Sequence, residues 1–161
     1  MRRLAPPAAL ALLAPVLLLA GCGSGGPVRR VSEPAASIQQ LTVRADGRWD
    51  VQLRLQNYSN VAMRFTATDI AIAFDNGAAA SVQAQPQLQV GPESADVFSA
   101  TVVPTAGGRA RIAGALADGG GLAYTLSGSV EAAPEGGDPR HYEVELSSAL
   151  SPVPGLPGVL R

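Results

Sequence analysis

Residues 49–57 read WDVQLRLQN, and the apolar residues Trp49, Val51, Leu53 and Leu55 alternate with polar ones. In an extended strand successive side chains point to opposite faces, so this spacing predicts one apolar and one polar face. The same period of two recurs in residues 122–130 and 142–150. Half-buried strands of this kind are typical of antiparallel sheets with one face in water. Trp49 is in phase with Val51 and Leu53, which favours a place in the core over a surface contact.

Turn-forming residues separate the alternating segments. Asp46-Gly47 and Asp75-Asn76-Gly77 are typical of tight hairpin turns, because glycine readily adopts the positive φ that such turns need. The Pro- and Gly-rich stretches 91–94 and 134–139 indicate longer connections. The pattern predicts an all-β, seven-stranded antiparallel β-sandwich, with strands at 36–45, 49–57, 61–74, 78–90, 95–103, 122–132 and 140–150.

Two segments depart from the simple pattern. In residues 61–74 the apolar positions change from odd (Met63, Phe65) to even (Ile70, Ile72, Phe74), which predicts a bulge or bend near Thr68-Asp69. The sequence of residues 108–118 (GRARIAGALAD) is compatible with either a helix or a strand. Their alanine content favours a short helix, whereas Gly114 weakens that interpretation.

The N-terminus predicts export and lipidation. Two arginines precede a 16-residue apolar run that ends at Leu19, shorter than the roughly 20 residues that a membrane-spanning helix needs. We expect residues 1–21 to be a cleaved signal peptide. Leu19-Ala20-Gly21-Cys22 resembles the lipobox of bacterial lipoproteins, in which signal peptidase II recognises the three residues before a cysteine that carries lipid. Cys22 is the only cysteine of the chain.

A lipidated Cys22 determines where the protein acts. Its diacylglyceryl and N-acyl chains would hold the protein firmly on a membrane that the chain does not span, because each buried CH₂ contributes about 0.8 kcal/mol. Residues 22–32 are predicted to be a flexible tether. The residue after Cys22 is Gly23 rather than the aspartate that retains enteric-type lipoproteins in the inner membrane. We therefore expect the periplasmic face of the outer membrane in a diderm, and otherwise a lipid anchor in the cell membrane.

Composition limits the remaining possibilities. Without the 21-residue signal, the 161-residue chain keeps 140 residues, with ten arginines, no lysine and 13 acidic residues, a net charge of −3. This charge is a poor match for nucleic acid.

A lipidated Cys22 leaves no thiol for a disulfide, so stability depends on an apolar core. The length suits one domain, residues 33–150. Residues 151–161 hold three prolines and are predicted to be an extended or loosely docked tail.

Residues for catalysis are scarce. His141 is the only histidine, so neither a Ser-His-Asp nor a Cys-His arrangement is expected, and the sequence predicts no enzyme, cofactor or metal. His141, Glu143 and Glu145 share one face of the last predicted strand, where they could hold a weakly bound metal ion. A solvated strand face is the better interpretation of this trio.

Four stretches resemble late embryogenesis abundant type 2 proteins, also called the water-stress and hypersensitive-response (WHy) domain family. They are WDVQLRLQN with its asparagine-led turn QNYSN, the strand pair through FDNG, the turn VGPESADVFSATV, and LAYTLSGSVEA with the closing HYEVELSSALSPVPG. The resemblance covers about residues 33–155. The family usually has Asn-Pro-Asn where this chain has Asn57-Tyr58-Ser59-Asn60. The resemblance implies a fibronectin type III-like sandwich with a short helix, often lipid-anchored in bacteria, and no catalytic residues.

Two functions fit these features. The first is a non-enzymatic binding or envelope-stress protein that meets an envelope protein partner through strand edges and loops, with Tyr58 in its turn as a candidate contact. The second is a carrier of a small hydrophobic or lipid ligand between the sheets, where small side chains would leave space (Ala71, Ala73, Ala84, Ala100). A large apolar pocket would favour the carrier. The sequence names neither the partner nor the ligand.

Overall fold

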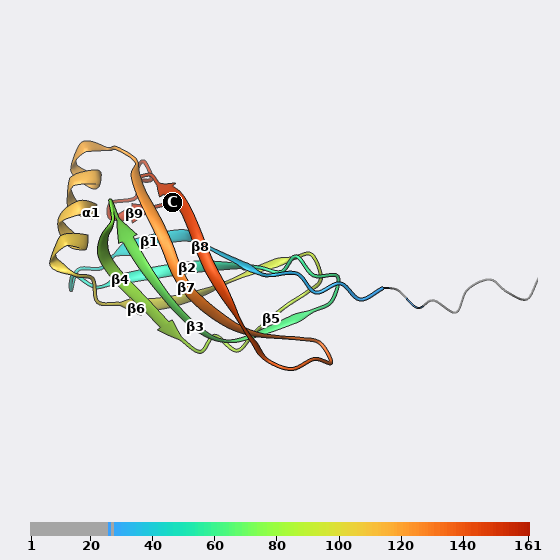
Figure 1. The fold of residues 1–161 in the computed structure, drawn as a ribbon. Helices are drawn as coiled ribbons and strands as arrows, with labels where there is room; N and C mark the ends of the chain where they lie inside the picture. Colours follow the sequence, from blue (N-terminus) through green and yellow to red (C-terminus); the bar gives the residue numbers. More distant parts are fainter. Residues whose placement is uncertain (1–25, 27) are drawn as a thin grey trace, which may run out of the picture.

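A computed structural model describes residue 26 and residues 28–161. Two antiparallel sheets pack face to face, and one helix lies at the end opposite to the start of the described chain (Figure 1). The elements are β1 (Ala35–Val43), β2 (Trp49–Gln56), β3 (Met63–Phe74), β4 (Gly77–Ala84), β5 (Leu88–Val90), β6 (Ala95–Val102), α1 (Ala106–Asp118), β7 (Leu122–Pro134), β8 (Arg140–Leu150) and β9 (Val159–Leu160).

The sheet topology confirms the predicted fold class. One sheet has the strand order β6-β2-β1-β9, and the other has β4-β3-β7-β8 with β5 also paired to β3. The described chain has nine strands rather than seven. The predicted strand 78–90 is divided into β4 and β5 because Pro86 has no backbone N–H and Gln87 has a φ of +49°. The second additional strand is β9, in the tail.

The core lies between the sheets and follows the predicted alternation. Val51, Leu53 and Leu55 are completely buried. Trp49 is also buried, and its ring packs against Phe74 with the ring centroids 5.9 Å apart. The prediction of a core position for Trp49 is therefore confirmed.

The predicted irregularity in β3 is real, but it lies nearer the start of the strand. The pairing of β3 with β7 shifts register between Phe65 and Ala67, so Thr66 is the extra residue. Phe65 is buried before the shift and Thr68 after it. The predicted location at Thr68-Asp69 was wrong because the buried Thr68 already belongs to the even-numbered phase, which its polar side chain conceals in the sequence.

The Asp75-Asn76 hairpin has the predicted tight form. Both residues have a positive φ, of 45° and 65°, and Phe74 pairs directly with Gly77. This two-residue turn with φ positive at both positions matches the right-handed twist of the strands that it joins.

Residues 106–118 form the helix α1, which decides the ambiguity that the sequence left open. Thr105 caps its start by accepting a hydrogen bond from Gly108 N at 2.9 Å, and its hydroxyl donates to Ala78 O at 2.7 Å. Gly119, with a φ of +65°, ends the helix. Ile112 is buried against the sandwich, so tertiary packing stabilises a helix that contains internal glycines.

The C-terminal tail belongs to the sandwich. Leu160 in β9 pairs with Leu41 of β1 and is completely buried, while Ser151 and Arg161 exchange two backbone hydrogen bonds. The predicted domain boundary at residue 150 was therefore wrong, and the tail is firmly docked rather than loose. Its prolines are compatible with this place because they lie before β9, in the turn that leads into this short edge strand.

Two tyrosines with buried hydroxyl groups, the buried Tyr124 and the half-buried Tyr142, provide a matched test of the core. Tyr124 accepts a hydrogen bond from Ile38 N of the opposite sheet at 3.2 Å, whereas the buried hydroxyl of Tyr142 has no partner among the described residues. We expect Tyr124→Phe to lower the free energy of unfolding by about 1–3 kcal/mol, because Ile38 N is left unsatisfied. Tyr142→Phe, which removes the same atom, is expected to be neutral or slightly stabilising. Chemical denaturation of both variants checks this, and an equal loss in both would contradict it.

Candidate functional site

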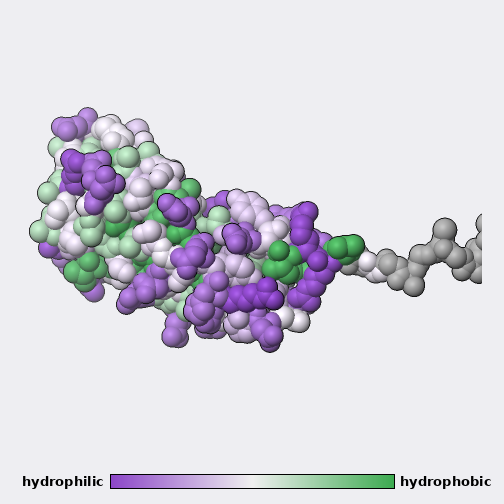
Figure 2. Space-filling view, in the orientation of Figure 1, coloured by the Kyte–Doolittle hydropathy of each residue, from purple (hydrophilic) through white to green (hydrophobic). Residues whose placement is uncertain are grey.

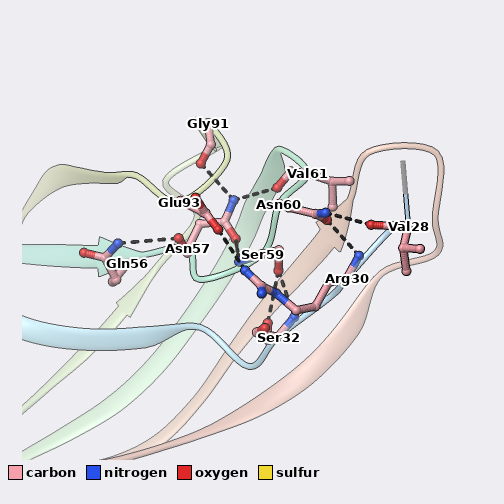
Figure 3. A network of polar contacts seen from close by, with 10 residues as sticks. All are labelled: Val28, Arg30, Ser32, Gln56, Asn57, Ser59, Asn60, Val61, Gly91 and Glu93. Atoms are coloured by element: carbon pink, nitrogen blue, oxygen red, sulfur yellow. Dashed lines mark hydrogen bonds and ion pairs between the residues drawn. The ribbon is translucent and has the colours of Figure 1, made fainter. Parts of the chain in front are cut away.

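The end of the sandwich at which the described chain begins contains a completely buried asparagine. Asn57 directly follows β2, and its Nδ2 donates hydrogen bonds to Val61 O at 2.8 Å and Gly91 O at 2.9 Å (Figure 3). Its Oδ1 accepts a hydrogen bond from Ser59 N at 2.8 Å, which folds the chain into an Asx turn. One carboxamide therefore joins the turn after β2 to the turn before β6.

The next residues of this turn hold the N-terminal segment. Ser59 Oγ accepts a hydrogen bond from Ser32 N at 2.9 Å. Asn60 Oδ1 accepts one from Arg30 N at 2.7 Å, and its Nδ2 donates to Val28 O at 2.8 Å (Figure 3). We call this arrangement, residues 28–32 bound to the turn 57–60, the N-terminal clasp.

Two arginines add contacts around the clasp. The Arg30 guanidinium lies 2.8 Å from a carboxylate oxygen of Glu93, and Arg29 donates to Glu135 O. Because the Arg30 and Glu93 side chains are 61% and 65% exposed, their ion pair contributes little to stability. The backbone and carboxamide bonds of the clasp are therefore its main stabilising contacts.

The clasp shows that the prediction of a flexible tether over residues 22–32 was wrong for residues 28–32. Residues 28–32 make specific hydrogen bonds to the domain, so they belong to it and the predicted boundary at residue 33 was wrong. The predicted lipidation site Cys22 and the signal peptidase residues Leu19, Ala20 and Gly21 lie outside the described residues.

Tyr58 is 53% exposed in the middle of this turn, which confirms its predicted exposure, and its role as a partner contact stays a prediction. Sequence reasoning missed the structural role of Asn57 and Ser59, because polar residues in a turn are normally assigned to the surface. The signal that could have found Asn57 is the asparagine-led turn of the family resemblance.

The acidic and histidine face of β8 is exposed, as predicted. His141 Nε2 lies 3.5 Å from a carboxylate oxygen of Glu131 on the neighbouring strand, and Glu143 and Glu145 are exposed along the same face. Within the described part of the chain, no group of three His, Cys, Asp or Glu side chains is arranged to hold a metal ion.

A separate polar cluster lies on the β1–β2 hairpin, at the end that carries α1. The Thr101 hydroxyl donates to Asp50 at 2.6 Å and lowers the pKa of that carboxyl, with a smaller contribution from Arg44. The side chain of Arg48 likewise lowers the pKa of Asp46. These groups lie at the surface, where their hydrogen bonds and ion pairs stabilise the hairpin turn.

The small residues predicted to leave space for a ligand do not line a shared interior. Ala71 is exposed, and Ala73, Ala84 and Ala100 are half-buried, with Ala84 and Ala100 packed against the core. The hollows of the described chain are open surface depressions, such as the one between Leu116 and the 152–158 turn and the one that Ala84 lines with Thr68 and Gln83. The structure therefore adds no observation in favour of the carrier.

No protein-family model and no curated protein matches this chain. Among solved structures, it is similar to a Northeast Structural Genomics Consortium target (13% identity, TM-score 0.47, 79% of this chain and 92% of the other), to a protein from Archaeoglobus fulgidus (12%, 0.45, 77% and 98%), and to a protein from Bordetella pertussis provisionally named ApaA (13%, 0.47, 81% and 100%). Similarity at this level carries no information about function.

No helix among the described residues is long and apolar enough to cross a membrane, and α1 has only 13 residues.

Proposed function

We propose that this chain is a bacterial lipoprotein, anchored through Cys22 at the periplasmic face of the outer membrane, that binds an envelope protein partner without catalysing a reaction. The observation that carries the proposal is Leu19-Ala20-Gly21-Cys22 after a short apolar run.

Binding through a strand edge is supported by β8. This strand is paired with β7 along residues 140–150, and β7 is its only strand neighbour among the described elements. Its C-terminal half presents the uncharged, exposed residues Ser147, Ser148 and Ala149. An open edge without charges is a suitable template for an added strand of a partner.

Membership of the WHy domain family is part of this proposal. Its support is Asn57, the first residue of the turn after β2, which corresponds to the asparagine that opens the family's turn. Asn57 is buried and its carboxamide makes three short hydrogen bonds, which gives a physical reason for an asparagine at this position.

The first experiment tests the anchor. We expect the wild-type chain to float with membranes and to carry the mass of a triacylated N-terminus, whereas Cys22→Ala accumulates as uncleaved precursor without lipid. Gly23→Asp is the matched control, because it keeps the cysteine and is expected to change only which membrane holds the protein. Membrane fractionation and intact mass measure both. A Cys22→Ala chain that is processed and retained like the wild type would overturn the anchor.

The second experiment tests the binding edge. A photo-crosslinking residue at Ser148 on β8 is expected to capture a defined envelope protein in cells, whereas the same residue at Ala110, exposed on α1, captures it poorly. Affinity purification followed by mass spectrometry identifies the product. If position 148 captures no protein while a lipid co-purifies with the chain, partner binding is wrong and the carrier becomes the better proposal.

A further inference from the structure

Exposed apolar side chains gather at the end of the molecule that carries the clasp. Five large hydrophobic residues are exposed in the described chain, and three of them belong to the clasp segments: Val28 (84% exposed), Val31 (38%) and Tyr58 (53%). Figure 2 shows apolar surface at this end, beside the point where the described chain begins. Exposed apolar groups that cluster mark a contact surface more often than scattered ones do.

The clasp holds these three residues in place. Val28 O accepts a hydrogen bond from Asn60 Nδ2, and Val31 lies between Arg30 and Ser32, whose backbone N–H groups are both bound to the turn 57–60. Tyr58 lies between two completely buried residues of that turn. Its exposure therefore results from a well-anchored backbone and not from a loose loop.

The covalent chain limits how far this end can be from the anchor. Five residues, 23–27, separate Cys22 from Val28. Each residue-to-residue step spans at most about 3.6 Å, so Val28 lies within roughly 22 Å of the lipidated cysteine. The opposite end, with α1 and the exposed Val103, must point away from the membrane if the clasp end faces it.

The charges at the clasp end suit a lipid surface without strong electrostatic attraction. Arg30 pairs with the carboxylate of Glu93, and Arg29 donates to the backbone carbonyl of Glu135, so two cationic and two anionic side chains lie at this end. Arginine can extend its charged group toward phosphate while its methylene stem stays in apolar surroundings. Tyrosine, with an apolar ring and a polar hydroxyl, is enriched at the headgroup level of bilayers.

We propose that Val28, Val31 and Tyr58 form a lipid-contacting surface that rests on the headgroup region of the bilayer in which Cys22 is anchored. This inference rests on the proposed lipidation. The clasp then fixes the orientation of the sandwich and directs α1 and the Asp75-Asn76 turn toward the periplasm, with the β8 edge open from the side.

The test uses the full lipidated chain in vesicles of phosphatidylethanolamine and phosphatidylglycerol that contain a headgroup-attached nitroxide quencher. Because Cys22 is the only native cysteine and is occupied by lipid, Tyr58→Cys and Val103→Cys each provide one free thiol for an environment-sensitive fluorophore. We expect quenching and a blue shift at position 58, unchanged in high salt, and neither at position 103. Adding Val28→Ser and Val31→Ser to the Tyr58→Cys chain is expected to reduce the quenching at 58.

The outcomes separate the two proposals. A chain that does not float with the vesicles and has a free Cys22 thiol overturns the lipid anchor and this inference with it. A chain that floats, but whose probe at 58 is as unquenched as the probe at 103, overturns the lipid contact alone. The lipid contact would also be overturned if the label at position 58 were shielded from water in cells but not in vesicles, because a protein would then cover the surface.

Discussion

Gly128→Ala is expected to lower the free energy of unfolding by about 4 kcal/mol, a loss larger than most single substitutions cause. Gly128 lies in β7 with a φ of +144°, a conformation that other residues rarely adopt. A Cβ placed there would lie 2.1 Å from Asp69 O and 3.0 Å from Ile70 Cα on β3. Both contacts are with backbone, so the two central strands would have to separate.

Gly114→Ala is the matched control for this variant. It makes the same chemical change on the exposed side of α1, where a Cβ would meet no atom within 4 Å. In a helix this substitution is expected to stabilise the protein by up to about 1 kcal/mol. Urea denaturation followed by circular dichroism measures both variants. A Gly128→Ala chain as stable as the wild type would mean that β3 and β7 are less closely packed than described here.

Asn57→Ala is expected to lower the free energy of unfolding by about 3 kcal/mol, because it leaves Ser59 N and the carbonyls of Val61 and Gly91 without their partner in a buried region. Two turns lose stability together, because the Asn57 carboxamide joins Val61, which precedes β5 in the chain, to Gly91, which follows it. We expect the unfolding midpoint to fall and the clasp to loosen, which hydrogen exchange at Ser32 and Arg30 would detect.

Asn60→Ala is the control for Asn57→Ala. Asn60 also makes two side-chain hydrogen bonds, to Val28 O and from Arg30 N, but it is exposed. Water can replace these bonds, so we expect a loss below about 1 kcal/mol, with faster exchange confined to the N-terminal segment. If the two variants lost equal stability, burial would not explain the importance of Asn57.

The alternating strands and the tight turn could be predicted because their chemistry is local. Trp49 to Leu55 alternate with polar residues, and Asp75-Asn76-Gly77 can form a tight turn without help from the rest of the chain. By contrast, the helix at 106–118 and the position of the β3 bulge depend on tertiary packing. Ile112 is buried against the sandwich, and Thr68 is a polar residue whose side chain is buried.

The candidate site was visible in the sequence only in part. The exposure of Tyr58 follows from its place in a turn, but the residue type alone does not distinguish Asn57, which is buried, from Asn60, which is not. The difference comes from Gly91, more than thirty residues away, whose carbonyl accepts a hydrogen bond from Asn57. Likewise, a Gly- and Arg-containing segment before residue 33 suggests a flexible tether until its partners in the turn 57–60 are known.

The sequence by itself determined the period-two strands and the sandwich class, because strand faces and tight turns are encoded in neighbouring residues, whereas lipid attachment at Cys22 stays a prediction. Only the tertiary structure decided that residues 28–32 and 159–160 belong to the domain. Their hydrogen bonds join residues far apart in the chain, and such pairings depend on how the two sheets bring distant backbone groups together.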